Sequence, residues 1–394
     1  MPAPRPCHNG FARPVRWAAS SALAAAVSLA NPAPAQPPSP QTVRIGIAGP
    51  LSGGAAHSGK DNENGARLAI EDLNRKAMVV GGHALHFELQ SEDDQGDPKQ
   101  ATVVALKLCD GHVAGVVGHY NSGATIPASR VYHDCGLPLV NASSSSPQVT
   151  RLGFETTFRI ISNDEVLGDA LARYAVEGLK ASRIAVVDDR TAYGQAAADQ
   201  FARAVQARGI AVVDRQYTTT ATTDFAPVIT ALKAKRPEVV FYGGLDAQAG
   251  PLLRQMHELG LDARLMGSGG VCTLELARLA GAENVDRSAI CTTGGGLVSA
   301  LPGGVEFEKR YRAAYDADVQ AYAPFTYDAV MLIADAMTRA GSTEPQKYLP
   351  ALAKTDYAGI TGRIRFNDQG DIVERPVMLI TFSGGKRVLL QEMK

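Results

Sequence analysis

The sequence contains 394 residues, of which 45% are hydrophobic and 20% are charged. This composition is typical of a globular protein and excludes a disordered or fibrous chain, and the length favours two domains over one. The 39 Lys and Arg residues nearly balance the 40 Asp and Glu residues and form no basic stripe, so nucleic-acid binding is not expected.

The first 35 residues have the layout of a secretory signal peptide. Arg5, Arg13 and Arg16 precede an uncharged run over residues 17–30, and the small-residue motif that ends at Ala35 follows this run. The run is too short to span a bilayer. We therefore expect cleavage after Ala35 and export of the protein to the periplasm.

Apolar strands and amphipathic helices alternate along the rest of the chain. Before residue 158, the pattern predicts strands at 43–47, 85–90, 113–117 and 138–141, and helices at 64–76, 98–109 and 125–133. A second series has helices at 165–179, 196–209, 225–234 and 249–259, and strands at 183–187, 211–214 and 239–242. This alternation predicts an α/β fold with two doubly wound lobes, each built on a parallel sheet covered on both faces.

The C-terminal third adds fewer predicted elements. A helix is expected over residues 327–340, and a hairpin is expected around Asn367–Gly370. These elements are too few to form a domain of their own. We expect them to complete the two lobes.

Export changes the interpretation of the cysteines, because an oxidising compartment permits disulfides. Cys109, Cys135, Cys272 and Cys291 remain after the signal peptide, and they allow three pairings or four buried thiols. We favour Cys109–Cys135, at the ends of successive predicted helices, and Cys272–Cys291, on either side of a short helix at 274–279. The cysteines and histidines lack the spacing of a zinc site, so no metal is expected.

Polar loops follow three of the predicted strands, at residues 118–123, 142–147 and 188–194. Doubly wound sheets bind ligands beyond the carboxyl ends of their strands. Serine hydroxyls and free backbone N–H groups at helix starts suit a carboxylate or another small anion. Ordinary helix capping explains one such loop, but two on the same lobe favour a binding site.

A series of short motifs carries a resemblance to a known family. The motifs are Ile45–Gly53, Asn64–Ile70, Asp93-Asp94, Asp97-Pro98, Gly118–Ser122, Tyr193-Gly194, Asp224-Phe225 and Tyr242–Gly244. In this order and spacing they resemble the branched-chain amino-acid-binding proteins, which are type I periplasmic solute receptors of ABC importers. The resemblance runs from about residue 42 to the C-terminus.

The resemblance implies a two-lobe receptor joined by a multi-strand hinge, which closes on its ligand and then docks on an inner-membrane ABC permease. The lobes would comprise residues 36–159 plus about 293–365, and residues 160–292 plus about 366–394. A monomer without a cofactor is expected. An extracytoplasmic ligand sensor on the same fold is an alternative function.

The family also implies the site residues. Ser122, Ser143 and Ser145 would hold the ligand's carboxylate from the first lobe. Tyr193 would cover the ligand from the second lobe when the lobes close. The ligand would be an amino acid of the branched-chain type or a related small carboxylate or amide.

Three positions depart from the family's pattern. Ser58 and Leu245 stand where an aromatic residue is usual, and Gly269 stands where an acidic residue pairs with the ligand's ammonium group. A buried ammonium without a counter-charge is costly. Either Asp246 has taken over this role, or the ligand lacks an α-amino group.

Enzyme functions fit the sequence less well. The segment 54–60 matches G-x-x-x-x-G-K, but Asp61 follows where a P-loop needs Ser or Thr for magnesium. The sequence contains neither a G-x-S-x-G elbow nor an H-E-x-x-H motif. A secreted hydrolase with Ser122 as nucleophile would need His119 as its base, and a histidine beside a strand end is more often simply hydrogen-bonded in place. We therefore predict a binding protein and not an enzyme.

Overall fold

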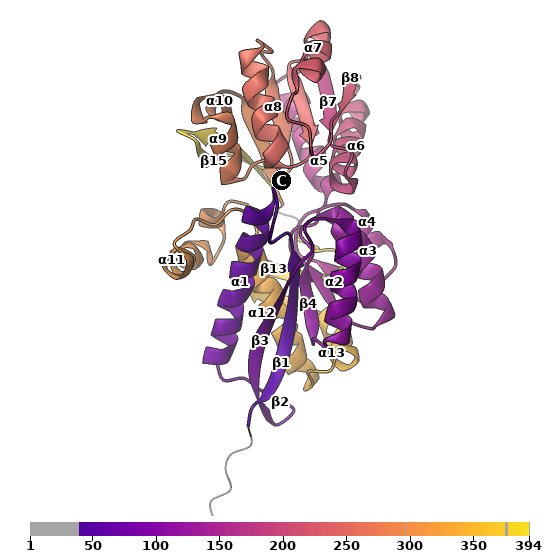
Figure 1. Ribbon diagram of the computed structural model, residues 1–394, viewed down its shortest axis with the longest axis vertical. Coiled ribbons are helices and arrows are strands. Elements are labelled where there is room, and N and C mark those ends of the chain that lie inside the picture. The colour runs from indigo at the N-terminus through magenta and orange to yellow at the C-terminus, as the bar shows by residue number, and fades with distance from the viewer. Residues whose placement is uncertain (1–38, 295, 375–376, 394) are drawn as a thin grey trace, which may run out of the picture. The chain divides into compact units, whose positions relative to one another are not determined.

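The computed structural model describes residues 39–294, 296–374 and 377–393 (Figure 1). The predicted signal peptide and its cleavage site lie outside the described residues. Residues 40–394 form one compact unit. Within it, two main sheets with helices on both faces confirm the predicted α/β class with two doubly wound lobes.

The first lobe is built on a six-stranded sheet in the order β2-β3-β1-β4-β5-β6. Its strands are β1 (Gln41–Gly49), β2 (Val79–Val80), β3 (His83–Asp93), β4 (Gly115–Gly118), β5 (Leu139–Asn141) and β6 (Thr157–Arg159). All neighbouring strands are parallel except β2 and β3. The carboxyl ends of β1, β4, β5 and β6 therefore share one edge of the sheet.

Two layers of helices cover this sheet. They are α1 (Ala56–Arg75), α2 (Pro98–Asp110), α3 (Ser122–Asp134), α4 (Gln148–Arg151), α11 (Gly304–Tyr315), α12 (Ala323–Ala340) and α13 (Pro345–Ala353). Adjacent residues of β4 show the division, because Val116 packs in one apolar cluster with α2 and α3, and Val117 packs in another with α1 and α12. This alternation explains why the strands read as continuous apolar runs.

The second lobe has a seven-stranded sheet in the order β15-β14-β11-β10-β9-β7-β8. Its strands are β7 (Ile184–Asp188), β8 (Val212–Tyr217), β9 (Val239–Gly243), β10 (Arg264–Gly267), β11 (Ala289–Thr293), β14 (Val377–Ser383) and β15 (Lys386–Met393). The strands β7 to β11 are parallel, whereas β14 and β15 pair antiparallel at one edge.

Helices also cover both faces of the second sheet. They are α5 (Asp164–Arg173), continued by a π-helical turn at Tyr174–Gly178, and α6 (Ala192–Ala207), α7 (Ala226–Lys235), α8 (Asp246–Glu258), α9 (Leu274–Ala280) and α10 (Ala282–Ser288). Residues of α5 and α6 share one apolar cluster, and residues of α7, α8, α9 and α10 share another. The chain passes between the lobes three times, after β6, after β11 and before β14.

The structure confirms a turn with antiparallel pairing around residues 367–370, but this pairing is short. Residues 367–370 form a tight turn, in which the Gly370 N–H donates to the Asn367 carbonyl at 2.9 Å and a single bridge joins Phe366 to Ile372. The antiparallel hairpins are β12 (Asp356–Gly359) with β13 (Gly362–Arg365), and β14 with β15. Asn and Gly signal a turn, but they do not show how far pairing extends on either side of it.

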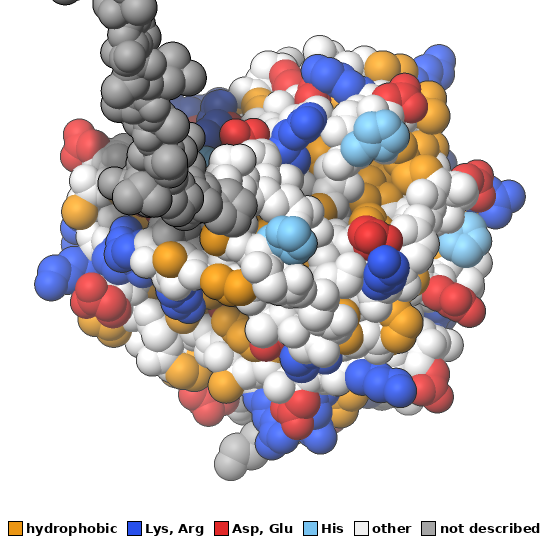
Figure 2. Space-filling model, turned by 90° about the horizontal axis from the view of Figure 1, so that it is seen from below, with side chains coloured by type: hydrophobic (Ala, Val, Ile, Leu, Met, Phe, Trp, Pro, Cys, Tyr) orange, Lys and Arg blue, Asp and Glu red, His pale blue; other side chains and the backbone are white. Residues whose placement is uncertain are grey.

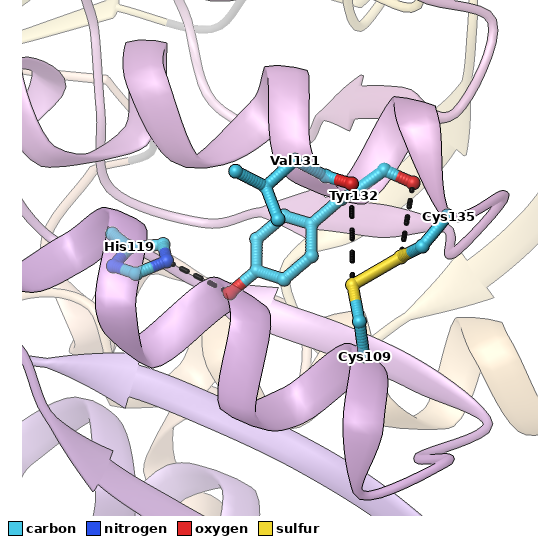
Figure 3. The surroundings of a disulfide bond; sticks show 5 residues. All are labelled: Cys109, His119, Val131, Tyr132 and Cys135. Atoms are coloured by element: carbon cyan, nitrogen blue, oxygen red, sulfur yellow. Dashed lines mark hydrogen bonds between the residues drawn. A yellow bond between two sulfur atoms is a disulfide. The ribbon is translucent and has the colours of Figure 1, made fainter.

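Both favoured cysteine pairs are joined in the structure. Cys109 bonds Cys135 where α2 and α3 end side by side, and Cys272 bonds Cys291 within the second lobe. Figure 3 shows the first bond beside Tyr132, whose hydroxyl reaches back to His119. In the chain-entropy model, loops of this size stabilise a fold by roughly 3 kcal/mol each.

Spanning a membrane with a helix requires a long apolar segment, and a one-sign charged surface requires one kind of charge to dominate a face of the molecule. No helix in the described ranges is both long and apolar enough to cross a bilayer. On the face drawn in Figure 2, Lys and Arg side chains are intermixed with Asp and Glu. This mixing agrees with the near-zero formal charge of the sequence.

Candidate functional site

A small cavity lies where the carboxyl ends of strands from both lobes meet. The space inside it that is open to a water-sized molecule is only about 20 Å³, so the lining side chains nearly fill it. Its lining residues are Tyr120, Asn121, Ser122, Ser143, Ser145, Tyr193, Leu245, Gly270 and Tyr322. The first five lie in loops or helix starts that follow β4 and β5, and the next three lie in loops or helix starts that follow β7, β9 and β10.

The serine side of the cavity is a rigid hydrogen-bonded loop pair. The side-chain oxygen Oδ1 of Asn141 accepts the backbone N–H groups of Ser143 and Ser144 at 3.1 and 2.7 Å. The side-chain nitrogen Nδ2 of Asn141 donates to the backbone carbonyls of Gly118 and His119 at 2.9 Å each. One buried amide therefore connects the loop after β5 to the loop after β4. This connection holds the backbone at Ser143, and the Ser122 hydroxyl joins the same loop by accepting the Ser146 N–H at 3.2 Å.

A buried arginine supports the same loop from behind. Arg159, at the end of β6, has no exposed surface, and its guanidinium donates to the carbonyls of Ser144 and Ser146 at 3.3 and 2.6 Å. Its other N–H groups donate to Asp371 at 2.6 and 2.8 Å and to Thr150 at 3.2 Å. Asp371 balances the charge of this guanidinium, so Arg159 acts on the serine loop through its hydrogen bonds.

Aromatic and apolar side chains form the rest of the wall. Tyr193 lies in the first turn of α6 and Leu245 caps α8, while Tyr322 precedes α12 and packs edge-on against Tyr120 with ring centroids 6.1 Å apart. Burial raises the pKa of Tyr193, Tyr120 and Tyr322 well above the ordinary value. These phenols therefore stay neutral at physiological pH and can donate hydrogen bonds.

Two contacts hold the segment that carries Tyr322. The Asp61 carboxylate, in α1, accepts the backbone N–H groups of residues 320 to 323 at 2.9 to 3.1 Å. Arg387, in β15 of the second lobe, donates to the carbonyls of Val319 and Gln320. The segment is thus held from both lobes at once.

The structure brings together four of the six predicted ligand-binding residues. Ser122, Ser143, Ser145 and Tyr193 line the cavity. Ser58 does not line it: this side chain is buried in α1, and its hydrogen bond with Tyr120 opposes the burial-driven rise in the pKa of that phenol. Ser58 therefore acts on the cavity only through Tyr120.

Asp246 is also absent from the cavity lining. Its buried carboxylate accepts a hydrogen bond from Thr273 and bonds the His57 imidazole at 2.8 Å. His57 belongs to α1 of the first lobe and Asp246 to α8 of the second. This geometry makes Asp246 a bridge between the lobes and argues against the direct ammonium contact considered from the sequence.

Tyr322 explains why an acidic residue is missing at position 269. A Cβ atom on Gly269 would lie 2.4 Å from the Tyr322 hydroxyl, which is too close for any side chain. The phenol therefore occupies the space that an acidic side chain would need. The two residues form a complementary pair that sequence spacing cannot reveal.

Contacts also argue against the alternative enzyme chemistries. Both ring nitrogens of the fully buried His119 are engaged, Nδ1 with Asp94 at 2.6 Å and Nε2 with Tyr132 at 2.9 Å, so His119 cannot serve Ser122 as a base. The G-x-x-x-x-G-K segment runs into α1 instead of forming a phosphate loop. Among the described residues, no group of three His, Cys, Asp or Glu is arranged for a metal ion.

Sequence reasoning overlooked Tyr120, Asn121, Gly270 and Tyr322 as lining residues. The first two stand in the polar loop that was singled out, directly before Ser122, so loop membership was a sufficient signal for them. Tyr322 lies in the connection between α11 and α12, which has no periodicity. The contacts that hold this connection come from Asp61 and Arg387, both far away in sequence.

The fold and the cavity between its lobes define a two-lobe solute-binding protein. The chain matches the family model for periplasmic binding proteins over residues 42–386, and it belongs to that family. It is 35% identical over 331 residues to an amino acid binding protein of Pseudomonas aeruginosa, across 84% of this chain and 87% of that protein. It is 33% identical over 338 residues to the leucine-, isoleucine-, valine-, threonine- and alanine-binding protein of the same organism, with the same coverage.

Solved structures show the same fold. LivJ from Streptococcus pneumoniae in complex with isoleucine superimposes with a TM-score of 0.80 at 25% identity, over 89% of this chain and 99% of that chain. The leucine-binding protein LivK from Thermotoga maritima gives a TM-score of 0.82 at 24% identity, over 89% and 98% of the two chains. The suspected family and fold are thereby confirmed.

Proposed function

We propose that the protein is a periplasmic receptor that binds a branched-chain amino acid, or a related small carboxylate or amide, and delivers it to an ABC importer. The observation that carries this proposal is the cavity in which Ser122, Ser143 and Ser145 face Tyr193 and Leu245. The serines offer donors to a carboxylate, and Leu245 with the neighbouring phenols suits an aliphatic side chain. The names of the relatives support the same ligand class.

The proposal includes a closing motion. One lobe comprises residues 36–159 plus about 293–365, and the other comprises 160–292 plus about 366–394, with residues 366–371 lying against β6 of the first lobe. Ligand binding draws the lobes together around the three crossings. The closed form, a monomer released by cleavage after Ala35, then docks on its inner-membrane permease.

Calorimetry on the exported protein tests this function. We expect leucine, isoleucine or valine, or the deaminated or amidated analogue of one of them, to bind at micromolar strength, and the scattering radius of gyration to shrink on binding. Tyr193→Ala should weaken binding at least about tenfold, equivalent to about 1.4 kcal/mol, because it removes the cover of the cavity. Tyr217→Ala, at an exposed tyrosine outside the cavity, is the matched control. Absence of binding by the whole ligand set would overturn the proposed function.

The His57–Asp246 bridge predicts that closure depends on pH. The hydrogen bond between His57 and Asp246 raises the pKa of His57 above the ordinary value of 6.5. In the open form we expect His57 to have an ordinary pKa, so the bridge stabilises closure fully below pH 6.5. It weakens as the pH rises through the raised pKa of the closed form.

We therefore expect affinity for a carboxylate ligand without an amino group to fall about three- to tenfold between pH 6 and 9. The fall is modest because His57 is partly exposed. His57→Gln should flatten the profile, and titrations at several pH values measure it. An unchanged slope in His57→Gln would show that the bridge does not control closure.

A further inference from the structure

Asp164, at the start of α5, is a buried carboxylate whose oxygens have no hydrogen-bond partner among the described residues. It has no exposed surface, and neither carboxylate oxygen makes a hydrogen bond of good geometry with the described residues. Burial raises the pKa of Asp164 to about 7, although the nearby Ser145 hydroxyl and the Arg159 charge oppose this rise. A buried carboxylate of this kind destabilises the fold unless a bound ligand supplies a hydrogen bond or a counter-charge.

Asp164 does not itself line the cavity, but it lies directly behind one of the lining residues. Its backbone N–H donates to the Ser145 carbonyl at 2.8 Å, and Ser145 lines the cavity. Burial raises the pKa of Tyr193 and Tyr322, and the Asp164 charge adds to the rise in both phenols. The carboxylate therefore lies close to three lining residues that come from both lobes.

Arg159, the positive charge near Asp164, already uses its hydrogen-bond donors on other groups. Arg159 uses all of its N–H groups on Asp371, Thr150 and the carbonyls of Ser144 and Ser146. The charged groups around the site are thus one cation, Arg159, and two carboxylates, Asp371 and Asp164. When both carboxylates are ionised, this buried set lacks one positive charge.

The other acidic candidates are not available for a ligand. Tyr322 occupies the space beside Gly269, and Asp246 is engaged by His57 and Thr273. We propose that Asp164 is the counter-charge for the ammonium group of the bound ligand and that it selects an α-amino acid over the corresponding plain carboxylate. This inference rests on the proposed function and specifies its ligand. The ammonium reaches Asp164 beside Ser145, while the serines hold the ligand's carboxylate.

Asp164→Asn keeps the size of the side chain and removes its charge. The test uses the branched-chain amino acid that binds the wild type most tightly, together with its own deaminated analogue. We expect the substitution to weaken amino-acid binding by about 10- to 100-fold, in line with the loss of one buried charge-assisted contact, while the analogue binds as well as before or better. Amino-acid binding within about twofold of the wild type would overturn the inference and leave the proposed function intact.

Proton uptake and release provide a second readout that does not depend on the variant folding. An ammonium that pairs with Asp164 stabilises its ionised form, so binding of the amino acid to the wild type should release a proton near pH 7. The analogue should not. Arg159 and Asp371 face the group with either ligand bound, and the contribution of His57 is also common to both ligands, so these contributions cancel in the comparison. Calorimetry in two buffers of different ionisation enthalpy measures the difference, and equal proton counts for the two ligands would overturn the inference.

If the wild type binds only the analogue, the inference fails and the carboxylate form of the proposed function stands. If it binds neither ligand, the proposed function itself fails. The thermal midpoint of Asp164→Asn confirms that the variant is folded. A variant that binds neither ligand while the wild type shows equal proton counts would assign Asp164 a structural role.

Discussion

Replacing Asp61 with alanine should destabilise the protein by about 3–5 kcal/mol and loosen the ligand cavity at the same time. The Asp61 carboxylate accepts four consecutive backbone N–H groups at the start of α12. Alanine would leave these donors without an acceptor, and each buried unsatisfied group costs roughly 1–3 kcal/mol. Because water can reach the half-buried members of the set, the total stays below the sum of four such costs.

Chemical denaturation monitored by circular dichroism measures the loss of stability. Glu71→Gln, at an exposed carboxylate on the same helix, is the matched control and should change little. Asp61→Asn keeps one acceptor oxygen and should fall between the two. Ligand affinity should drop along with stability, because the same segment carries Tyr322. An alanine variant as stable as the control would refute the anchoring role.

The anchoring role also explains why the start of α1 was mispredicted. The sequence pattern indicates a helix from residue 64, but α1 begins at Ala56. Its first two turns carry buried polar residues, among them Asp61 and Asn62, and so lack the apolar stripe that identifies a helix. Gly59 belongs there because a Cβ atom would lie 1.9 Å from the Pro50 carbonyl oxygen.

The central strands, such as β4, β7 and β9, were predictable because they are short apolar runs buried on both faces. Val43–Ile47 and Val239–Tyr242, for example, fall inside β1 and β9. The serine loops could be predicted equally well, because they follow such strands directly. Periodicity and strand ends are local properties, so a single sequence contains them.

The remaining site residues depend on contacts that are distant in sequence. Tyr322 is held by Asp61, and the space at Gly269 is filled by Tyr322. Asp164 looks like an ordinary acidic residue in the first turn of a helix, where it would interact favourably with the helix dipole. Only the packing of Ser145, Tyr193 and Tyr322 around it shows that it is buried.

Arg159→Met should have an effect on stability as large as that of Asp61→Ala, and a greater effect on binding. Removing one partner of a buried ion pair costs about 3–5 kcal/mol, and here the loss would leave Asp371 with only Thr150 and Asn163. The carbonyls of Ser144 and Ser146 would also lose their donors. We therefore expect urea denaturation to show the destabilisation and calorimetry to show loss of carboxylate binding.

A double variant separates these two effects. Arg159→Met combined with Asp371→Leu removes both buried charges and should recover much of the stability, as apolar replacements of buried ion pairs often do. Binding should stay lost, because the serine loop still lacks the guanidinium that orients its carbonyls. Arg151→Gln, which breaks a partly exposed pair with Glu165, should leave both properties nearly unchanged. If the double variant regained binding together with stability, Arg159 would be needed only for folding and the serine loop would hold its geometry without it.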